Sequence, residues 1–327
     1  MKLHKRKVVY MIDQKDITAF YQSRIEPRFQ TLEPERQRIA RIRIFIAMCS
    51  ALVLGGFIAV CYYTSPYIEY AGAAGIIYAV VAISCYCLIG ADFEKKLKSF
   101  LLTEITNFLG IEQGERASEN PLSLQSFQRY GILPSGNQQS LTDHFHGKKE
   151  GIEVDIADAA IKHKTETRNK DGRTETTVTT LFQGPIFRFS YNRPIKGHVI
   201  LVKDGGRIIN FLSKSAFPGD RVTLENAEFE SRFEIYGTDQ VEARYVLTPR
   251  FMERLLELYS YMEEKPFGIS FSESFVYLTL DARTDWFEPG SLFSKLADQQ
   301  RVKILIEQLN FAFEVARILN LTAKSHA

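Results

Sequence analysis

Two apolar runs near the start of the chain, residues 44–63 and 70–90, constrain its architecture more than any other feature. Each run is about 20 residues long, and at a rise of about 1.5 Å per helical residue this length matches a hydrocarbon core roughly 30 Å thick. Between residues 44 and 91 only Glu69 carries a formal charge, and it lies in the short connection. The pattern predicts a transmembrane helical hairpin.

Basic residues flank the predicted hairpin on both sides. The connection at residues 64–69 contains neither Lys nor Arg, whereas cations precede the first run and follow the second: Arg36, Arg38, Arg41, Arg43, Lys95, Lys96 and Lys98. Loops rich in Lys and Arg stay in the cytoplasm. We therefore expect both termini in the cytoplasm and the connection outside.

Small residues recur every four positions along both apolar runs, a spacing that lets helices approach closely in lipid. The residues predicted to pack membrane helices are Ala47, Ala51, Gly55 and Ala59 in the first run and Ala71, Gly75 and Ala79 in the second. These stripes either close the hairpin on itself or face another protein, including a second copy of the chain.

Composition excludes some classes of protein. The net charge is +2 and no block of like charges is long, so we expect no nucleic-acid partner. All four cysteines lie inside the apolar runs, at Cys49, Cys61, Cys85 and Cys87, where they are expected to be small packing residues. The rest of the chain therefore has no disulfide framework.

The hairpin divides the chain into four parts. Residues 1–43 form a cytoplasmic amphipathic segment in which Pro27 and Pro34 should interrupt or kink a helix. Residues 44–90 are the hairpin, and residues 91–126 a stalk helix, ending at Gly110, and a linker. We expect the two extensions of the hairpin to pack together. Residues 127–327 are the cytoplasmic domain.

Strand signals dominate the first two thirds of that domain. Period-two alternation and turn residues predict strands at residues 151–156, 181–191, 198–203, 207–212, 229–236 and 241–247, and β-hairpins at 161–180 and 267–280. Helices are expected at residues 250–262, with Thr248 as N-cap, and at 294–319. Consecutive strands with helices at the ends predict an α+β fold with a mainly antiparallel sheet.

The passage at residues 229–258, FESRFEIYGTDQVEARYVLTPRFMERLLEL, is the most recognisable part of the chain. It resembles a bacterial membrane-protein family, domain of unknown function three-one-three-seven. FYQSRIEP at 20–27, the strand at 181–189 and WFEPGSLF at 286–293 also fit this family, although Trp286 stands where an aliphatic residue is expected. The resemblance implies a bacterial inner-membrane protein and supplies no activity. It also suggests a LemA-type membrane protein as a partner.

Catalytic signatures are absent from the sequence. No phosphate-binding glycine loop, nucleophile elbow or zinc-binding helix motif occurs, so we expect no cofactor. The best metal candidates are His144 and His146, which lie two apart on a predicted strand, with Asp143, Asp155 or Asp158 as a further ligand. Solvated strand histidines are the alternative interpretation.

Two further clusters invite a binding role. Trp286, Phe287 and Glu288 form an aromatic pair beside a carboxylate, which suits a partner surface or a turn that anchors the last helix to the sheet. The hairpin at residues 161–180 is basic enough to touch lipid head groups, although acidic residues dilute its charge.

Three functions remain open from the sequence. We favour a non-catalytic inner-membrane protein whose cytoplasmic domain serves as a protein-interaction or scaffolding module. A membrane-anchored metal-dependent hydrolase using the His144 and His146 region is the first alternative, and a lipid-surface sensor is the second.

Overall fold

The computed structural model describes residues 13–63, 68–113, 122–168, 174–203, 219–262, 265–287, 290, 292–296, 298–319 and 321. The chain forms two compact units, one comprising Met1–Phe108 and Glu288–Ile306 and the other Leu109–Phe287 and Glu307–Ala327. The predicted strand at residues 207–212 lies outside the described residues, as does the turn at 169–173.

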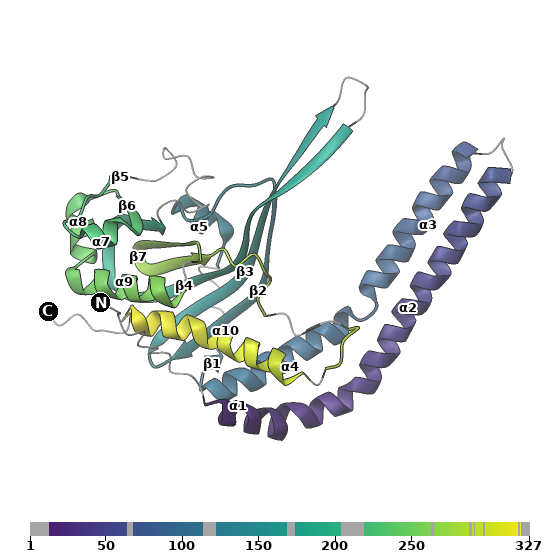
Figure 1. Ribbon diagram of the computed structural model, residues 1–327, viewed down its shortest axis with the longest axis horizontal. Coiled ribbons are helices and arrows are strands. Elements are labelled where there is room, and N and C mark those ends of the chain that lie inside the picture. The colour runs from purple at the N-terminus through teal and green to yellow at the C-terminus, as the bar shows by residue number, and fades with distance from the viewer. Residues whose placement is uncertain are drawn as a thin grey trace, which may run out of the picture. The chain divides into compact units, whose positions relative to one another are not determined.

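The first unit is built on long helices (Figure 1). Its elements are α1 (Gln14–Phe20), a π-helical turn (Tyr21–Ile25), α2 (Glu26–Tyr63), α3 (Ile68–Leu88) and α4 (Ala91–Leu109). Pro34 lies inside α2 without ending it. Pro27 is the second residue of α2, and its missing N–H would have bonded within the π-helical turn that precedes the helix. The irregular hydrogen bonding therefore lies where proline would break the α-helical ladder.

The two extensions of the apolar hairpin pack on each other, as the sequence predicts. The rings of Phe20 on α1 and Phe108 on α4 stack with centroids 4.4 Å apart. Buried apolar residues recur at helical spacing on both sides: Ile17, Phe20, Ile25 and Phe29, and Phe93, Leu97, Leu101 and Ile105. Water exclusion therefore holds this stalk together.

The second unit is an antiparallel seven-stranded sheet flanked by helices. The strands are β1 (Glu112–Gln113), β2 (Gln138–Lys149), β3 (Ile152–Arg168), β4 (Thr174–Lys203), β5 (Asp220–Arg221), β6 (Phe233–Gly237) and β7 (Phe267–Leu280). Their order is β1-β2-β3-β4-β6-β5, and β7 pairs with β4. The predicted α+β class is confirmed.

Helices and loops cover both faces of this sheet. The helices are α5 (Leu124–Arg129), α7 (Ala227–Glu230), α8 (Gln240–Val246), α9 (Pro249–Tyr261) and α10 (Gln299–Ile318), the last of which continues from one unit into the other. On one face Phe127 of α5 packs edge-on against Tyr277. On the other, Phe251 of α9 meets Phe271 and Phe311 of α10 meets Phe187.

Strand β4 organises the sheet because it is long enough to serve three neighbours. Its first part pairs with β3 and its last residues, Val199–Lys203, with β6. The other edge pairs with β7. The predicted hairpin at residues 161–180 is confirmed by the register from Lys162↔Thr180 to Arg168↔Thr174, and in Figure 1 this ribbon extends beyond the rest of the sheet.

Two strand predictions are wrong, and the strand predicted at residues 229–236 is right only from Phe233, because residues 227–230 form helix α7. Residues 241–247 form helix α8 because Asp239 caps it, its carboxylate accepting hydrogen bonds from the N–H groups of Val241 and Glu242. Residues 267–280 form one strand, not a hairpin. The apparent turn is a bulge at Glu273, with φ 55°, opposite an irregularity between Ser190 and His198 in β4.

Other boundaries shift slightly. Helix α9 begins after Thr248 as predicted, although the Thr248 side chain makes no capping hydrogen bond. Helix α10 begins at Gln299, later than the predicted residue 294. The region predicted as a linker contains β1 and the start of α5.

Candidate functional site

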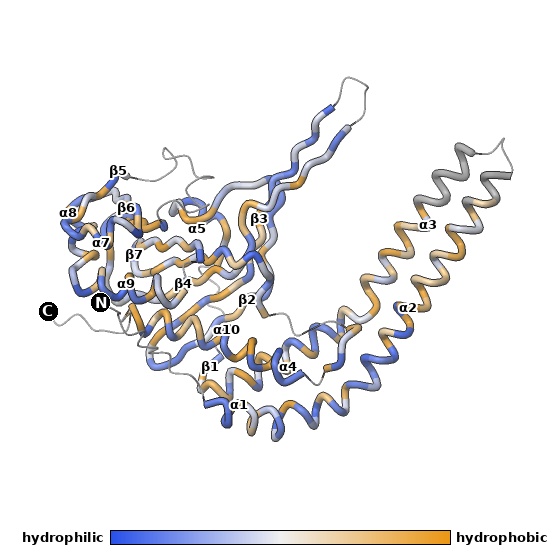
Figure 2. The backbone as a smooth tube through the Cα atoms, in the orientation of Figure 1, coloured by the Kyte–Doolittle hydropathy of each residue, from blue (hydrophilic) through white to orange (hydrophobic). Residues whose placement is uncertain are grey.

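The α2–α3 hairpin exposes an unusual amount of apolar surface. Two helical stretches, Gln14–Phe57 and Ile77–Leu109, each contain a window long and apolar enough to cross a membrane, and only 6% of either window is buried. The exposed apolar side chains include Ile44, Phe45, Met48, Leu52, Val53, Ile77, Val80, Val81, Ile83 and Leu88. Figure 2 shows apolar colour along both helices.

Such a surface is costly in water. Burying one large aliphatic or aromatic side chain is worth roughly 1.5–3 kcal/mol, so leaving a cluster of this size exposed to water is unfavourable. The hairpin therefore has the length, composition and exposure of a bilayer-spanning element.

The small-residue stripe of α2 faces away from the hairpin interior. Ala47, Ala51, Gly55 and Ala59 are exposed, and a Cβ on Gly55 would meet nothing within 4 Å. The half-buried positions in this part of the helix include the larger Ile46, Cys49, Leu54 and Phe57, together with Ser50. On α3, Ala79 is half-buried, whereas the side chains of Ala71 and Gly75 lie outside the described set.

Arg43 ties the two helices together where the apolar surface ends. Its Nε donates to the Ile89 carbonyl at 2.6 Å, its Nη1 lies 3.3 Å from Glu94 Oε1, and its guanidinium lies 5.3 Å from the Tyr86 ring centroid. Gly90, with φ +94°, makes this close approach available, because a Cβ there would come within 2.9 Å of Ile39 and Leu292. The junction is thus closed by a buried cation bonded to a helix end.

A second arginine fastens residues 292–296 to the same helix. Arg36 donates to the Leu292 carbonyl and pairs with Glu33 at 2.6 Å, and the Leu296 N–H donates to Glu33 at 3.4 Å. The hydrogen bond from Arg36 is the main reason that the pKa of Glu33 falls from 4.5 to about 2. Glu33 therefore stays ionised and keeps the Arg36 charge compensated.

On the sheet, a polar row crosses three strands in register. His146, Asp155 and Arg188 are direct neighbours on β2, β3 and β4. Asp155 lies 2.8 Å from His146 Nδ1 and accepts two hydrogen bonds from Arg188, at 2.9 and 2.6 Å. The guanidinium also covers the Phe275 ring at 4.9 Å. Each charged side chain in this row is paired with another, as is usual in a cluster that supports the fold.

The same face of the sheet buries polar atoms that lack partners. Within the described residues, His198 Nδ1 and the hydroxyls of Ser270 and Ser272 make no hydrogen bond. Ser272 lies opposite His198 in register and Ser270 opposite Ile200. Burial lowers the pKa of His198, so its imidazole is neutral near pH 7.

Among the residues predicted to bind metal, His146 and Asp155 are in contact, and the others have different surroundings. His144 is exposed, Asp143 sits at an irregular position with φ 59°, and His146 pairs with Asp155. Asp158 is buried and accepts a hydrogen bond from the Trp286 N–H at 2.5 Å. In the described part of the chain, no group of three His, Cys, Asp or Glu residues is placed to hold a metal ion.

The predicted aromatic cluster lies in the core of the second unit. Trp286 packs edge-on against Phe187 of β4 and Phe311 of α10, with centroids 5.9 and 5.4 Å away, and Phe287 is buried with its N–H bonded to Gln308. The two rings therefore join the sheet to its last helix. Glu288 lies outside the described residues.

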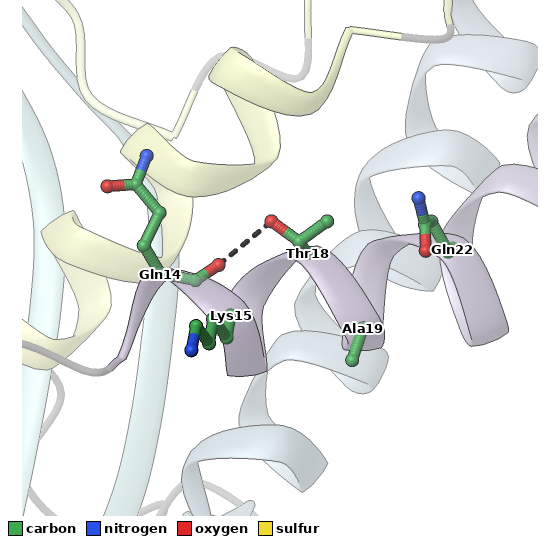
Figure 3. Close-up of a pocket in the computed structure, with 5 residues that line it drawn as sticks. All are labelled: Gln14, Lys15, Thr18, Ala19 and Gln22. Atoms are coloured by element: carbon green, nitrogen blue, oxygen red, sulfur yellow. Dashed lines mark hydrogen bonds between the residues drawn. The ribbon is translucent and has the colours of Figure 1, made fainter.

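A shallow hollow lies along α1 (Figure 3). Gln14, Lys15, Thr18, Ala19 and Gln22 line it, and its volume is about 340 Å³. Thr18 donates to the Gln14 carbonyl at 2.8 Å and receives a hydrogen bond from Gln299. These bonds satisfy the one hydroxyl that lines the hollow.

Sequence reasoning missed Arg188 and His198 as members of polar clusters. Only strand register brings Arg188 beside Asp155, or His198 beside Ser272. The sequence carries a local signal of contact only for His146 and Asp155. The short connection between β2 and β3 makes these two residues neighbours.

The two units define a class of protein with an apolar helical hairpin and an antiparallel α+β domain. Residues 180–321 match the family described as "Protein of unknown function (DUF3137)". The resemblance drawn from the sequence is confirmed over this part of the chain, which includes the long motif at residues 229–258.

No curated protein matches the chain. Among solved structures, the crystal structure of the mycobacterial trehalose monomycolate transport factor A, TtfA, is similar over 70% of this chain and 98% of that one, at 12% identity and a TM-score of 0.33. At this TM-score the likeness supports no conclusion about fold or function.

Proposed function

We propose that the protein is a non-catalytic module of the bacterial inner membrane, anchored by the α2–α3 hairpin, whose α+β domain binds another protein. The observation that carries the anchor is the exposed apolar surface of both helices, of which Leu52 and Leu88 are each 74% exposed. Cations on the stalk side of that surface favour a cytoplasmic position for the termini and the domain.

Helix α8 supports the binding role. Val241 is 75% exposed and Tyr245 is 58% exposed, and their spacing of four places them on one side of the helix. The opposite side is fixed in the core through Ala243 and Val246. A rigid helix presenting an apolar pair suits contact with a protein surface. A LemA-type membrane protein is the partner suggested by family resemblance.

The test is quantitative capture from native membranes with the full chain, comparing wild type with the Val241→Ser, Tyr245→Ser double variant. Val178→Thr, at an exposed site on the β3–β4 ribbon, is the matched control. We expect at least one membrane protein to be captured by wild type and the control and lost from the double variant. Identical capture by all three would refute α8 as the binding surface.

A further inference from the structure

Cations at the junction of hairpin and stalk fall into two groups. Arg36 and Arg43 are buried and bonded to Glu33, Glu94 and main-chain carbonyls. Arg38, Arg41, Lys95 and Lys96 are exposed and form no ion pair with any described residue. Among the described residues, the only hydrogen bond donated by one of these four side chains runs from Arg41 Nε to its own helix, at the Gln37 carbonyl.

These four exposed residues, called here the cation collar, lie close to where the apolar surface ends. Arg38 and Arg41 precede the exposed Ile44 and Phe45 by two turns or less, within about 10 Å along the helix axis. Lys95 and Lys96 lie a similar distance beyond Ile89. Arg43 of α2 bonds to Ile89 and to Glu94 of α4, and so holds these two helices together near the end of the apolar surface.

Acidic neighbours leave the collar positive. Glu33 and Glu94 are engaged by Arg36 and Arg43, and Glu35 and Asp92 are exposed without an ion pair to the collar. Exposed cations therefore outnumber exposed carboxylates near the end of the apolar surface. The cations without an ion pair are available to bind negative charge from outside the protein. Phosphate oxygens suit this set, because arginine binds them through its planar fork and lysine as a point charge.

We infer that the cation collar binds anionic phospholipid head groups. This inference rests on the proposed membrane anchor and adds the class of lipid that the junction selects. A basic side chain near an anionic lipid surface gains about 1 kcal/mol, which corresponds to a roughly five-fold preference per residue. Arg36 and Arg43 take no part, because their guanidinium groups are used within the protein.

The experiment reconstitutes the full chain in equimolar phosphatidylcholine and phosphatidylglycerol vesicles, re-purifies it in mild detergent and measures the retained lipids by mass spectrometry. We expect phosphatidylglycerol to be enriched roughly five-fold or more over the bulk ratio. The Arg38→Gln, Arg41→Gln, Lys95→Gln, Lys96→Gln variant should retain the bulk ratio.

A charge-matched control neutralises four exposed cations of the domain: Lys196→Gln, Arg221→Gln, Arg244→Gln and Arg250→Gln. It should keep the wild-type enrichment. No enrichment in wild type, enrichment that survives in the collar variant, or equal loss in the control would overturn the inference. Displacement of the lipid by inorganic phosphate would also overturn it, by showing an anion site without lipid selectivity.

Alkaline extraction of the same vesicles separates this inference from the proposed anchor. If the chain stays in the pellet and shows no enrichment, only the lipid inference fails. If the chain is released, the anchor fails and the inference falls with it.

Discussion

At the scale of single residues, strand β7 buries two kinds of polar side chain. Some find a hydrogen-bond partner among the described residues, and others do not. Thr279 is fully buried and its hydroxyl donates to the Ile132 carbonyl at 3.1 Å, whereas the fully buried Ser272 hydroxyl makes no bond within the described residues. An unsatisfied buried hydroxyl costs roughly 1–3 kcal/mol, while a satisfied one contributes about 1 kcal/mol.

This contrast predicts opposite effects of two substitutions on one strand. Ser272→Ala should leave the free energy of unfolding unchanged or raise it by up to about 1 kcal/mol, because no bond is lost. Thr279→Val should lower it by about 1–2 kcal/mol, because the Ile132 carbonyl loses its donor. Chemical denaturation of the full chain in detergent measures both. A loss at Ser272 as large as that at Thr279 would show that the hydroxyl is bonded in solution.

A second residue-scale prediction concerns acid. The folded pKa of Glu33 is about 2 and its ordinary value is 4.5, so its stabilising contribution is complete above 4.5 and is lost as the pH falls toward 2. The stability difference between wild type and Glu33→Gln should therefore shrink across this window. Melting temperatures measured through the window test this, and a difference that is independent of pH would contradict it.

At the scale of elements, the sequence was informative where one local signal dominated. The apolar runs, the Gly110 helix stop and the Thr248-Pro249 helix start all correspond to observed boundaries. Alternating apolar residues at 241–247 misled, because valine and tyrosine suit strands while the decisive feature is the Asp239 cap. The bulge at Glu273 was read as a turn because only pairing with β4 shows that the strand continues.

The same limits apply to the candidate sites. The apolar surface of the hairpin follows from composition and could be predicted from the sequence. The hydrogen bonds from Arg43 to Ile89 and from Arg36 to Leu292 could not, because they join residues 46 and 256 positions apart. Likewise, Trp286 could not be assigned to the core without knowing that α10 returns to the sheet beside β4.

The Asp239 cap gives an element-scale prediction. Asp239→Ala should destabilise the domain by about 1 kcal/mol, because two N–H groups at the start of α8 lose their acceptor. Thr248→Ala, at the start of α9, is the control, since the Thr248 side chain makes no capping hydrogen bond and a smaller loss is expected. The unfolding midpoints of the two variants are compared with that of wild type. Equal losses of stability would contradict the role of Asp239 as the cap.

At the scale of the whole molecule, we propose that the hairpin is an anchor and the sheet domain an interaction module. The hairpin carries no charge between residues 44 and 63 or between 70 and 90, so it lacks the ionisable groups that mark a transport path. The proposed binding surfaces lie outside the apolar segment: α8 for a protein partner and the cation collar for lipid.

Site-directed labelling tests the membrane anchor and its orientation most directly. The four native cysteines are replaced by alanine, and single cysteines are introduced as Ser65→Cys in the connection and Glu225→Cys on the exposed surface of the domain. Intact bacterial cells with a permeabilised outer membrane are treated with a membrane-impermeant maleimide. We expect labelling at residue 65 before lysis and at residue 225 only after lysis. Labelling at residue 225 in intact cells, or none at residue 65, would contradict it.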